Sequence, residues 1–444
     1  MASHKDLGVP EGSFLLTRAR VPACFLAGGP AGATDAEGSC LVDIVVANGV
    51  VDGIVPSGQA SATDLPTVDA EGRQVWATLI DMHTHLDKGQ VIPRATPDGT
   101  LEGGVRLTMA DRKRWTHEDI AARMRFALKC AYSHGVSTIR THLDSPEEWL
   151  PRRSLPVFRE LRSEWAGKVD LQAVGLAPLS IFKTDWGNTL ADLMAESGGV
   201  LGGVTDALGV YEGLADEALD GLLDLFLDAA TDRGLDVDLH VDQTESLDLF
   251  ALPRIAAAVM RKKFKGRVVV GHCVSLALAP EDVAERTIRM AVDAGLHFVT
   301  LPTPMVYLQD RKPNRTPRWR GVTLAHELLD AGLKVAIGGD NCRDAWFPFG
   351  DHDMLDTLQQ SVRIFQLDNP IAKALPMAGP MPSDIVGAGH QGRIAVGAPA
   401  DFILLSARTL NEAMCRPQAD RIVVRNGRRV TETLPDYAEL DAVM

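Results

Sequence analysis

One local pattern recurs through the middle of this chain: a helical stretch ends at a glycine, and a short apolar strand follows at once. The first such helix starts near Thr116, a suitable N-cap, and stops at Gly135. The same order returns around Gly234, Gly295 and Gly332. With the other apolar runs, the expected strands cover 77–84, 136–141, 170–176, 202–210, 235–241, 267–271, 296–301 and 333–337.

Strand and helix units of this kind predict a parallel sheet that is buried on both faces and closed as an α/β (β/α)8 TIM barrel. An open, doubly wound sheet is the alternative, but the first strand lacks the Gly-x-Gly-x-x-Gly turn typical of that fold. A length of 444 residues suits a barrel with a smaller domain beside it.

The two ends of the chain carry short strands and tight turns instead. Asn-Gly pairs at 48–49 and 426–427 stand between Val-rich runs, which is typical of two-residue hairpins. Further strands are expected at 14–16, 41–46 and 401–405. Since neither end has enough strands for a stable sheet, we expect both to pair into one small β-sandwich, with two separate edge hairpins as the alternative. The expected boundaries are 1–75 and 386–444 for the sandwich and 76–385 for the barrel.

Composition indicates a globular protein that does not cross a membrane. Hydrophobic residues make up 45% of the chain, charged residues make up 23%, and no apolar run approaches a membrane span. The net charge of -14 argues against nucleic acid and anionic membranes as partners. The N-terminus lacks the pattern of a secretory signal, so we expect a cytoplasmic protein. The six cysteines include no Cys-x-x-Cys pair, which argues against disulfides or a thiolate zinc site.

Several polar residues fall where the expected strands end, and in a barrel this is the catalytic rim. His83 and His85 share one face of a strand, because residues i and i+2 point the same way. His240 and Asp340 end two other strands. These three imidazoles and one carboxylate could hold one divalent ion and leave a position for water.

A structural role is the alternative for each of these histidines taken alone. His142 and His272 also end expected strands, and for His142 a structural role and a role in the site both stay open. Five histidines at one rim are hard to explain as ordinary buried residues, so we prefer the metal site.

A series of motifs resembles a known family. The chain is similar to the amidohydrolase superfamily, and within it to the bacterial cytosine deaminase-like group, which includes the isopropylammelide hydrolases. The matching motifs are His-Thr-His-Leu-Asp-Lys (83–88), Arg-Thr-His-Leu-Asp (140–144), His-Val-Asp-Gln (240–243), Gly-His-Cys-Val-Ser (271–275), Tyr-Leu-Gln-Asp-Arg (307–311), Pro-Arg-Trp-Arg-Gly-Val-Thr (317–323) and Gly-Asp-Asn-Cys-Arg-Asp-Ala-Trp-Phe-Pro-Phe-Gly (339–350).

The resemblance implies a mononuclear Zn2+ or Fe2+ site with His83, His85, His240 and Asp340 as its ligands. It also implies that His272 polarises the reacting bond or holds the developing oxyanion, and Asp340 can take a proton from water. We also expect a homo-oligomer.

One catalytic position departs from the family pattern. The family has a proton-shuttling Glu as the fourth residue of a His-x-Asp-Glu motif, and this chain has Gln243 there. An amide keeps the hydrogen-bonding shape but cannot relay a proton. Three explanations of Gln243 are open. It is an engineered residue that traps a ligand, or a native residue in a protein that uses Asp242, His272 or Lys88 as the acid, or a sign that activity was lost.

The expected substrate-binding residues are Lys88, Asn341, Arg343 and Trp346. Lys88 matches a substrate-facing lysine of the isopropylammelide hydrolases, with a solvated loop lysine as the alternative. Trp346 could stack on a flat ring, with packing under the neighbouring loop as the alternative. Asn341 and segment 176–179 differ from the residues that cytosine deaminases carry, so cytosine is not the leading substrate.

We therefore expect a metal-dependent aminohydrolase that acts on a small cyclic amide or amidine, such as a pyrimidine, pterin, creatinine-like or hydroxylated triazine ring. One alternative is amide hydrolysis without ammonia release. The other is a silent protein that only binds such a ring. Relatives with two metals usually carry a carboxylated lysine on strand four, and 204–210 contains no lysine.

Overall fold

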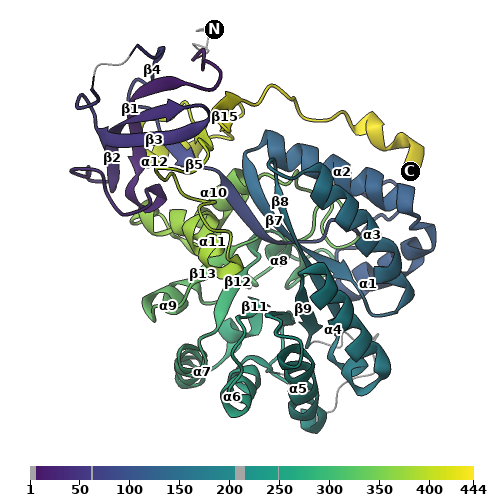
Figure 1. The fold of residues 1–444 in the computed structure, drawn as a ribbon. Helices are drawn as coiled ribbons and strands as arrows, with labels where there is room; N and C mark the ends of the chain where they lie inside the picture. The colour runs from purple at the N-terminus through teal and green to yellow at the C-terminus, as the bar shows by residue number, and fades with distance from the viewer. Residues whose placement is uncertain (1–6, 62–63, 206–215, 249) are drawn as a thin grey trace. The chain divides into compact units, whose positions relative to one another are not determined.

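The computed structural model describes residues 7–61, 64–205, 216–248 and 250–444 (Figure 1). These residues form two compact units, each assembled from separated pieces of the chain. The first contains 1–80, 130–138 and 353–434, and the second contains 81–129, 139–352 and 435–444. The domain boundaries expected at 75 and 385 stay a prediction.

A parallel sheet of eight strands confirms the predicted barrel. The strands are hydrogen-bonded in sequence order, from β6 at one edge to β13 at the other. Thr84, the last residue of β6, forms a parallel bridge with Asp340, and the backbone N–H of Asp340 donates to the carbonyl of His83 at 2.7 Å. This contact brings the two edges together at the end of the strands. The strands are β6 (Leu79–Thr84), β7 (Val136–Asp144), β8 (Asp170–Pro178), β9 (Val200–Val204), β10 (Val237–Val241), β11 (Val268–His272), β12 (His297–Thr300) and β13 (Val335–Ile337).

Helices surround these strands, as the ribbon shows (Figure 1). An additional helix, α1, lies between β6 and the predicted helix that starts after Thr116. The helices up to residue 352 are α1 (Leu101–Asp111), α2 (His117–Ser133), α3 (Trp149–Glu164), α4 (Asp185–Ser197), α5 (Asp216–Thr231), α6 (Leu252–Lys262), α7 (Glu281–Asp293), α8 (Pro302–Leu308) and α9 (Ala325–Asp330). The first unit contains α10 (Met354–Phe365), α11 (Pro380–Val386) and α12 (Leu410–Cys415).

The start and stop signals of α2 act as predicted. The backbone N–H of Asp119 donates to the hydroxyl of Thr116 at 3.2 Å, which satisfies one of the unpaired donors of the first turn. After the helix, Gly135 adopts a φ of +86°, which a residue with a side chain rarely takes. The chain can therefore turn at once into β7, whose residues are all buried.

The two ends of the chain form two small four-stranded sheets in the first unit. One sheet has the order β3-β2-β1-β4, and the other has the order β16-β15-β14-β5. Strand β5 comes from the N-terminal segment and pairs antiparallel with the C-terminal β14, so the expected pairing of the two ends is confirmed. The strands are β1 (Phe14–Pro22), β2 (Ser39–Ala47), β3 (Val50–Pro56), β4 (Thr67–Asp69), β5 (Val75–Ala77), β14 (Phe402–Leu404), β15 (Ile422–Arg425) and β16 (Arg428–Arg429).

Both predicted Asn-Gly hairpins are present. Asn48 and Gly49 have φ values of +52° and +80°, and Asn426 and Gly427 have +50° and +68°. Positive φ at both turn residues matches the type I′ turn that suits the twist of antiparallel strands. The ring of Phe14 in one sheet lies edge-on to that of Phe402 in the other, with centroids 6.4 Å apart.

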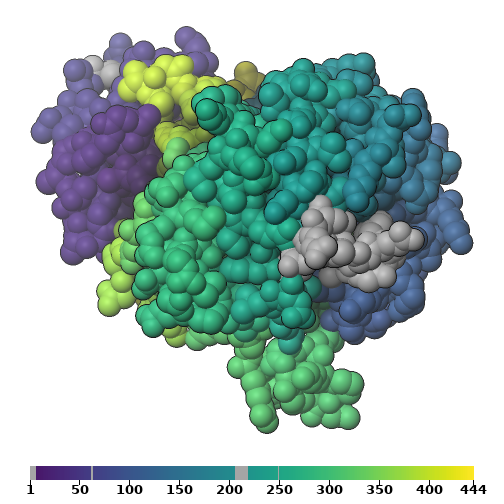
Figure 2. Space-filling view, turned by 90° about the horizontal axis from the view of Figure 1, so that it is seen from below, coloured from purple at the N-terminus to yellow at the C-terminus, as the bar shows by residue number. Residues whose placement is uncertain are grey.

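One segment of the second unit stands out from the rest of its surface in the space-filling view (Figure 2). Its green colour places it near 310–320, where the backbones of Lys312 and Arg315 form an isolated antiparallel bridge and most side chains are exposed. Within the described part of the chain, no helix is long and apolar enough to cross a membrane.

The pair of Arg421 and Asp353 offers a test of the first unit. Arg421 donates to both carboxylate oxygens of Asp353 at 2.8 and 2.6 Å, and Asp353 also caps the start of α10. Burial raises the pKa of Asp353, but the hydrogen bonds and charge of Arg421 outweigh burial and hold this pKa below its usual value.

We predict that Arg421→Met lowers the free energy of unfolding by about 1–3 kcal/mol at pH 7, because the largely buried carboxylate of Asp353 loses two charged hydrogen bonds and keeps only its contacts with His134 and the start of α10. A carboxylate with a depressed folded pKa contributes stability above its unfolded pKa and loses it on acidification. The difference between the variant and the wild type should therefore shrink below about pH 4. Denaturant titrations at several pH values measure this difference.

Arg286→Met, at an exposed pair with Asp282, is the control, and it should lower the free energy of unfolding by less than about 1 kcal/mol. Equal losses in the two variants would contradict the prediction.

Candidate active site

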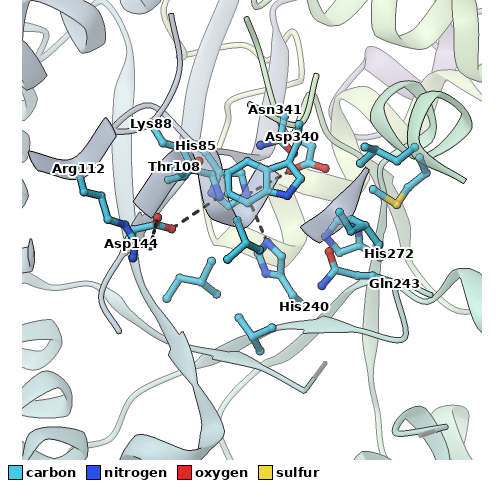
Figure 3. Close-up of a pocket in the computed structure, with 17 residues that line it drawn as sticks. His85, Lys88, Thr108, Arg112, Asp144, His240, Gln243, His272, Asp340 and Asn341 are labelled. Atoms are coloured by element: carbon cyan, nitrogen blue, oxygen red, sulfur yellow. Dashed lines mark hydrogen bonds and ion pairs between the residues drawn. The ribbon is translucent and has the colours of Figure 1, made fainter. Parts of the chain in front are cut away.

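Three imidazoles and one carboxylate converge at the ends of β6, β10 and β13. Figure 3 shows His85, His240 and Asp340 of this group. The Nε2 atom of His240 lies 3.2 Å from that of His83 and 3.3 Å from that of His85. The Oδ1 atom of Asp340 lies 3.2 Å from His85 Nε2 and 3.8 Å from His83 Nε2. The structure therefore brings the four expected metal ligands into one cluster.

His272, the last residue of β11, belongs to the same cluster. One possible ligand atom from each of His83, His240, His272 and Asp340 lies within 4.8 Å of all the others. The rings of His240 and His272 have centroids 4.8 Å apart. Figure 3 shows His272 facing the cavity between His240 and Asp340, with Gln243 beside it.

The donor atoms of this cluster suit a divalent cation. Burial lowers the pKa of His83, His85 and His240 well below the usual value, and it lowers the pKa of His272 to about 4. Burial also raises the pKa of Asp340. Among the described residues, neither oxygen of Asp340 and neither ring nitrogen of His272 has a hydrogen-bond partner. Neutral imidazoles and a buried carboxylate oxygen are the ligands that zinc and iron accept, so the cluster fits such an ion.

Two glycines allow the end of β13 to approach His83 this closely. A Cβ atom at Gly338 would lie 2.9 Å from both the Cβ and the carbonyl oxygen of His83. The backbone N–H of Gly339 donates to the carboxylate of Asp81 at 3.0 Å, and the Thr84 hydroxyl donates to the Asp340 carbonyl at 2.8 Å. The position of Asp340 therefore depends on contacts made by β6 itself.

His142 lies behind the cluster. Its ring stacks on that of His83 with centroids 3.9 Å apart, and its Nε2 lies 3.3 Å from Asp238 Oδ1. Arg140 donates to the other oxygen of Asp238 at 3.0 Å. His83, His142 and Asp238 also form a second group of possible ligand atoms. His142 therefore packs against His83 and faces Asp238, on the side of His83 away from the cavity lining.

A cavity opens beside the cluster. Polar residues line two sides of it, with His272 and Gln243 on one side and Arg112 and Asp144 on the other (Figure 3). It is lined by His85, Lys88, Leu101, Val105, Thr108, Arg112, Asp144, Leu176, Val204, His240, Gln243, His272, Met305, Leu308, Asp340, Asn341 and Trp346.

Lys88 is buried in the wall of this cavity, so the alternative of a solvated loop lysine is wrong. Its side chain is 8% exposed, and its ammonium lies 3.7 Å from Asp144 and 4.2 Å from the centre of the Trp346 ring. Arg112 donates to the second oxygen of Asp144 at 2.6 Å. Burial raises the pKa of Asp144, but Lys88 and Arg112 outweigh burial and hold it well below its usual range. Two cations and one carboxylate thus form one wall.

Sequence reasoning missed part of this wall. Asp144 ends one of the quoted motifs, which was the available signal, whereas Arg112 and Thr108 lie in a region without a motif. Trp346 and Asn341 line the cavity as expected, and Asn341 also donates to Asp344 at 2.6 Å.

Arg343 does not line the cavity. Its guanidinium donates to Gln90 at 3.0 Å and lies 4.4 Å from the ring centre of Tyr437. Its backbone N–H donates to the carbonyl of Phe349 at 3.0 Å. These contacts turn Arg343 to the outer side of the loop after β13, so we leave it out of the site.

Gln243 lines the cavity, but its neighbour Asp242 serves the backbone. The carboxylate of Asp242 accepts hydrogen bonds from the N–H groups of Ala251 and Leu252, at 2.8 and 3.0 Å, where α6 begins. This orientation makes Asp242 unsuited to deliver a proton in the cavity. The carbonyl of Gln243 accepts from the side chain of Gln309 at 2.7 Å, which fixes the backbone at this position. On strand four, β9 ends at Val204, and 206–210 lie outside the described residues.

We predict that Asp242→Ala lowers the free energy of unfolding by about 1–3 kcal/mol, because two buried backbone donors lose a charged acceptor. Asp242→Asn should lose less, since it keeps one acceptor oxygen. Chemical denaturation measures both, with the exposed Asp248→Ala of the same loop as the control. A catalytic acid would behave differently: Asp242→Asn would abolish turnover at unchanged stability.

Comparisons with known proteins agree with this geometry. The family model described as "Amidohydrolase family" matches residues 116–431. A pterin deaminase from Rhizobium rhizogenes is 45% identical over 100% of this chain and 99% of its own length. An N-isopropylammelide isopropyl amidohydrolase from Pseudomonas sp. is 26% identical over 82% of this chain and 88% of its own.

Among solved structures, a 5-methylcytosine deaminase from Klebsiella pneumoniae has the same fold, with a TM-score of 0.78 and 22% identity over 95% of this chain and 98% of its own. The resemblance seen in the sequence motifs is thereby confirmed, and the chain belongs to the amidohydrolase family.

Proposed function

We propose that this protein is a metal-dependent aminohydrolase that replaces the exocyclic amino group of an N-heterocycle by an oxo group and releases ammonia. One observation carries the proposal: the buried His and Asp cluster opens into a cavity whose wall holds Lys88 and Trp346, in a chain 45% identical over its whole length to a pterin deaminase. A fused pterin-like ring is the first candidate substrate, and pyrimidine, creatinine-like and triazine rings follow. We also propose a cytoplasmic location, no nucleic-acid partner and a homo-oligomer as the working unit.

The proposed cofactor is one Zn2+ or Fe2+ ion held by His83, His85, His240 and Asp340. When bound, such an ion supplies a lower pKa for water and a positive charge for the developing oxyanion. The described cluster supports this proposal, because its buried donor atoms converge on one point and lack other partners.

The side chains around the cluster have separate proposed roles. Asp340 accepts the proton of the attacking water, and His272 hydrogen-bonds the oxygen that develops charge on the reacting carbon. Lys88 and Trp346 hold the ring, since an ammonium and an indole lie together in the cavity wall. Asn341 holds a polar edge of the ring with its amide.

Gln243 does not fit one step of the proposed reaction, the protonation of the leaving nitrogen. The leaving nitrogen must gain a proton, and an amide can position that nitrogen but cannot supply the proton. Two further candidate functions follow from this one residue: hydrolysis of an amide without ammonia release, and binding of the ring without turnover. The first would show a ring-opened or side-chain product, and the second would show binding alone.

We predict about one divalent ion per chain in purified protein and a large loss of that ion in His83→Ala. The reason is that removing one of four ligands weakens a site with neutral nitrogen donors. Elemental analysis after dialysis measures the content, and His326→Ala, outside the cluster, is the control. Metal retained at full stoichiometry in the double His83→Ala, His85→Ala variant would overturn the assignment.

We predict that Gln243→Glu raises turnover by roughly 10²–10⁴-fold, the usual contribution of a general acid or base, while ring affinity changes little. Gln and Glu have similar size, and both keep an acceptor oxygen. Ammonia release from a panel of heterocycles, with pterin first, measures this in both proteins. If Gln243 is native to another proton route, the substitution is neutral or harmful, because a carboxylate near Asp340 raises the pKa of one of the two.

A further inference from the structure

Two consecutive glycines, Gly103 and Gly104, lie in the first turn of α1. Glycine is among the poorest residues for a helix, because it loses the most backbone freedom on folding. Neither glycine has the positive φ that would explain its presence. Each position must therefore be explained by what a side chain would meet there.

Gly103 is explained by the start of the helix. A Cβ atom there would lie 1.9 Å from the carboxylate of Asp98. The N–H of Gly103 donates to the Thr100 hydroxyl at 2.9 Å, and Thr100 in turn donates to Asp98. This glycine leaves room for the residues that cap α1.

Gly104 is explained by the cavity wall. A Cβ atom there would lie 2.3 Å from both Cδ1 and Nε1 of Trp346 and 2.5 Å from Cε2. Near-equal distances to three neighbouring atoms of the five-membered ring place Gly104 against the face of the indole rather than at its edge. The indole therefore occupies the space that any other residue at this position would fill.

Other contacts restrict where the indole could move. The ammonium of Lys88 lies 4.2 Å from the centre of the indole ring. The side chain of Trp346 also packs against the buried cluster of Val91, Ala95 and Ala345. The backbone N–H of Trp346 donates to Asp344 at 2.9 Å. A methyl group on α1 would have to displace the indole or push the helix away, and both changes alter the cavity.

We propose that Gly104 is a specificity-determining residue: by lacking a side chain it seats the Trp346 indole and so sets the width of the cavity for a flat ring. This inference rests on the proposed function, since it takes the cavity to be the substrate site. We expect a fused two-ring substrate, which covers more of the cavity wall than a single ring, to depend more on this width. Gly104 acts through Trp346 and is not itself a catalytic residue.

The test compares Gly104→Ala with Gly221→Ala. Gly221 lies in α5, and a Cβ atom there would meet nothing within 4 Å, so Gly221→Ala makes the same substitution in a helix without a clash. We expect Gly104→Ala to raise KM for pterin roughly tenfold, as an overpacked wall implies, and to raise KM for cytosine less. Gly221→Ala should leave both values unchanged. Equal KM values for the two variants would overturn the inference, whereas a wild type that releases no ammonia from any ring would instead count against the proposed function.

A stability measurement tests the same contact without any substrate. Gly104→Ala should lower the melting temperature, and Gly221→Ala should not. In a Trp346→Leu background the clash is absent, so Gly104→Ala should then behave like Gly221→Ala. The same loss from Gly104→Ala in both backgrounds would show that the indole is not what requires this glycine.

Discussion

The site depends on the hydrogen bond that joins the first and last strands of the barrel. The N–H of Asp340 donates to the carbonyl of His83, and Thr84 holds the carbonyl of Asp340 from the other side. This contact between the end of β6 and the segment after β13, which we call the seam, closes the sheet and also places a carboxylate beside two imidazoles. A change that opens the seam would separate Asp340 from the histidines, so we expect barrel closure and site assembly to be one event.

Burial gives this cluster its chemical character. In water, imidazoles with a pKa near 6.5 would be partly protonated and would repel one another at these distances. Inside the barrel their pKa values are lowered, first by the loss of solvent and then by one another. The same burial makes Lys88 and Arg112 depend on Asp144, because isolated buried charges are costly. Charges in the cavity wall are therefore held in fixed positions, as recognition of one ring requires.

The sequence predicted the barrel and the four converging residues because both depend on local periodicity. An apolar run predicts a buried strand, a cap and a glycine mark the start and end of the helix before it, and residues at strand ends must meet at one rim. Arg112 and Gly104 could not be found this way. Arg112 meets Asp144 across 32 positions of the chain, and Gly104 meets Trp346 on a loop far along it. Such contacts depend on how α1 packs, and the sequence of α1 does not predict which residues it contacts. Arg343 shows the reverse error, since proximity in sequence to Asp340 suggested the cavity while the side chain turns to Gln90.

The central claim is that the imidazole cluster is the metal centre of a ring-hydrolysing site. Anomalous diffraction from crystals of the metal-loaded protein, recorded at the absorption edge of the bound ion, tests it most directly. The account predicts that the strongest peak lies among His83, His85, His240 and Asp340, within coordination distance of all four and facing the cavity. A strongest peak elsewhere, or one that Asp340 does not touch, would contradict the account.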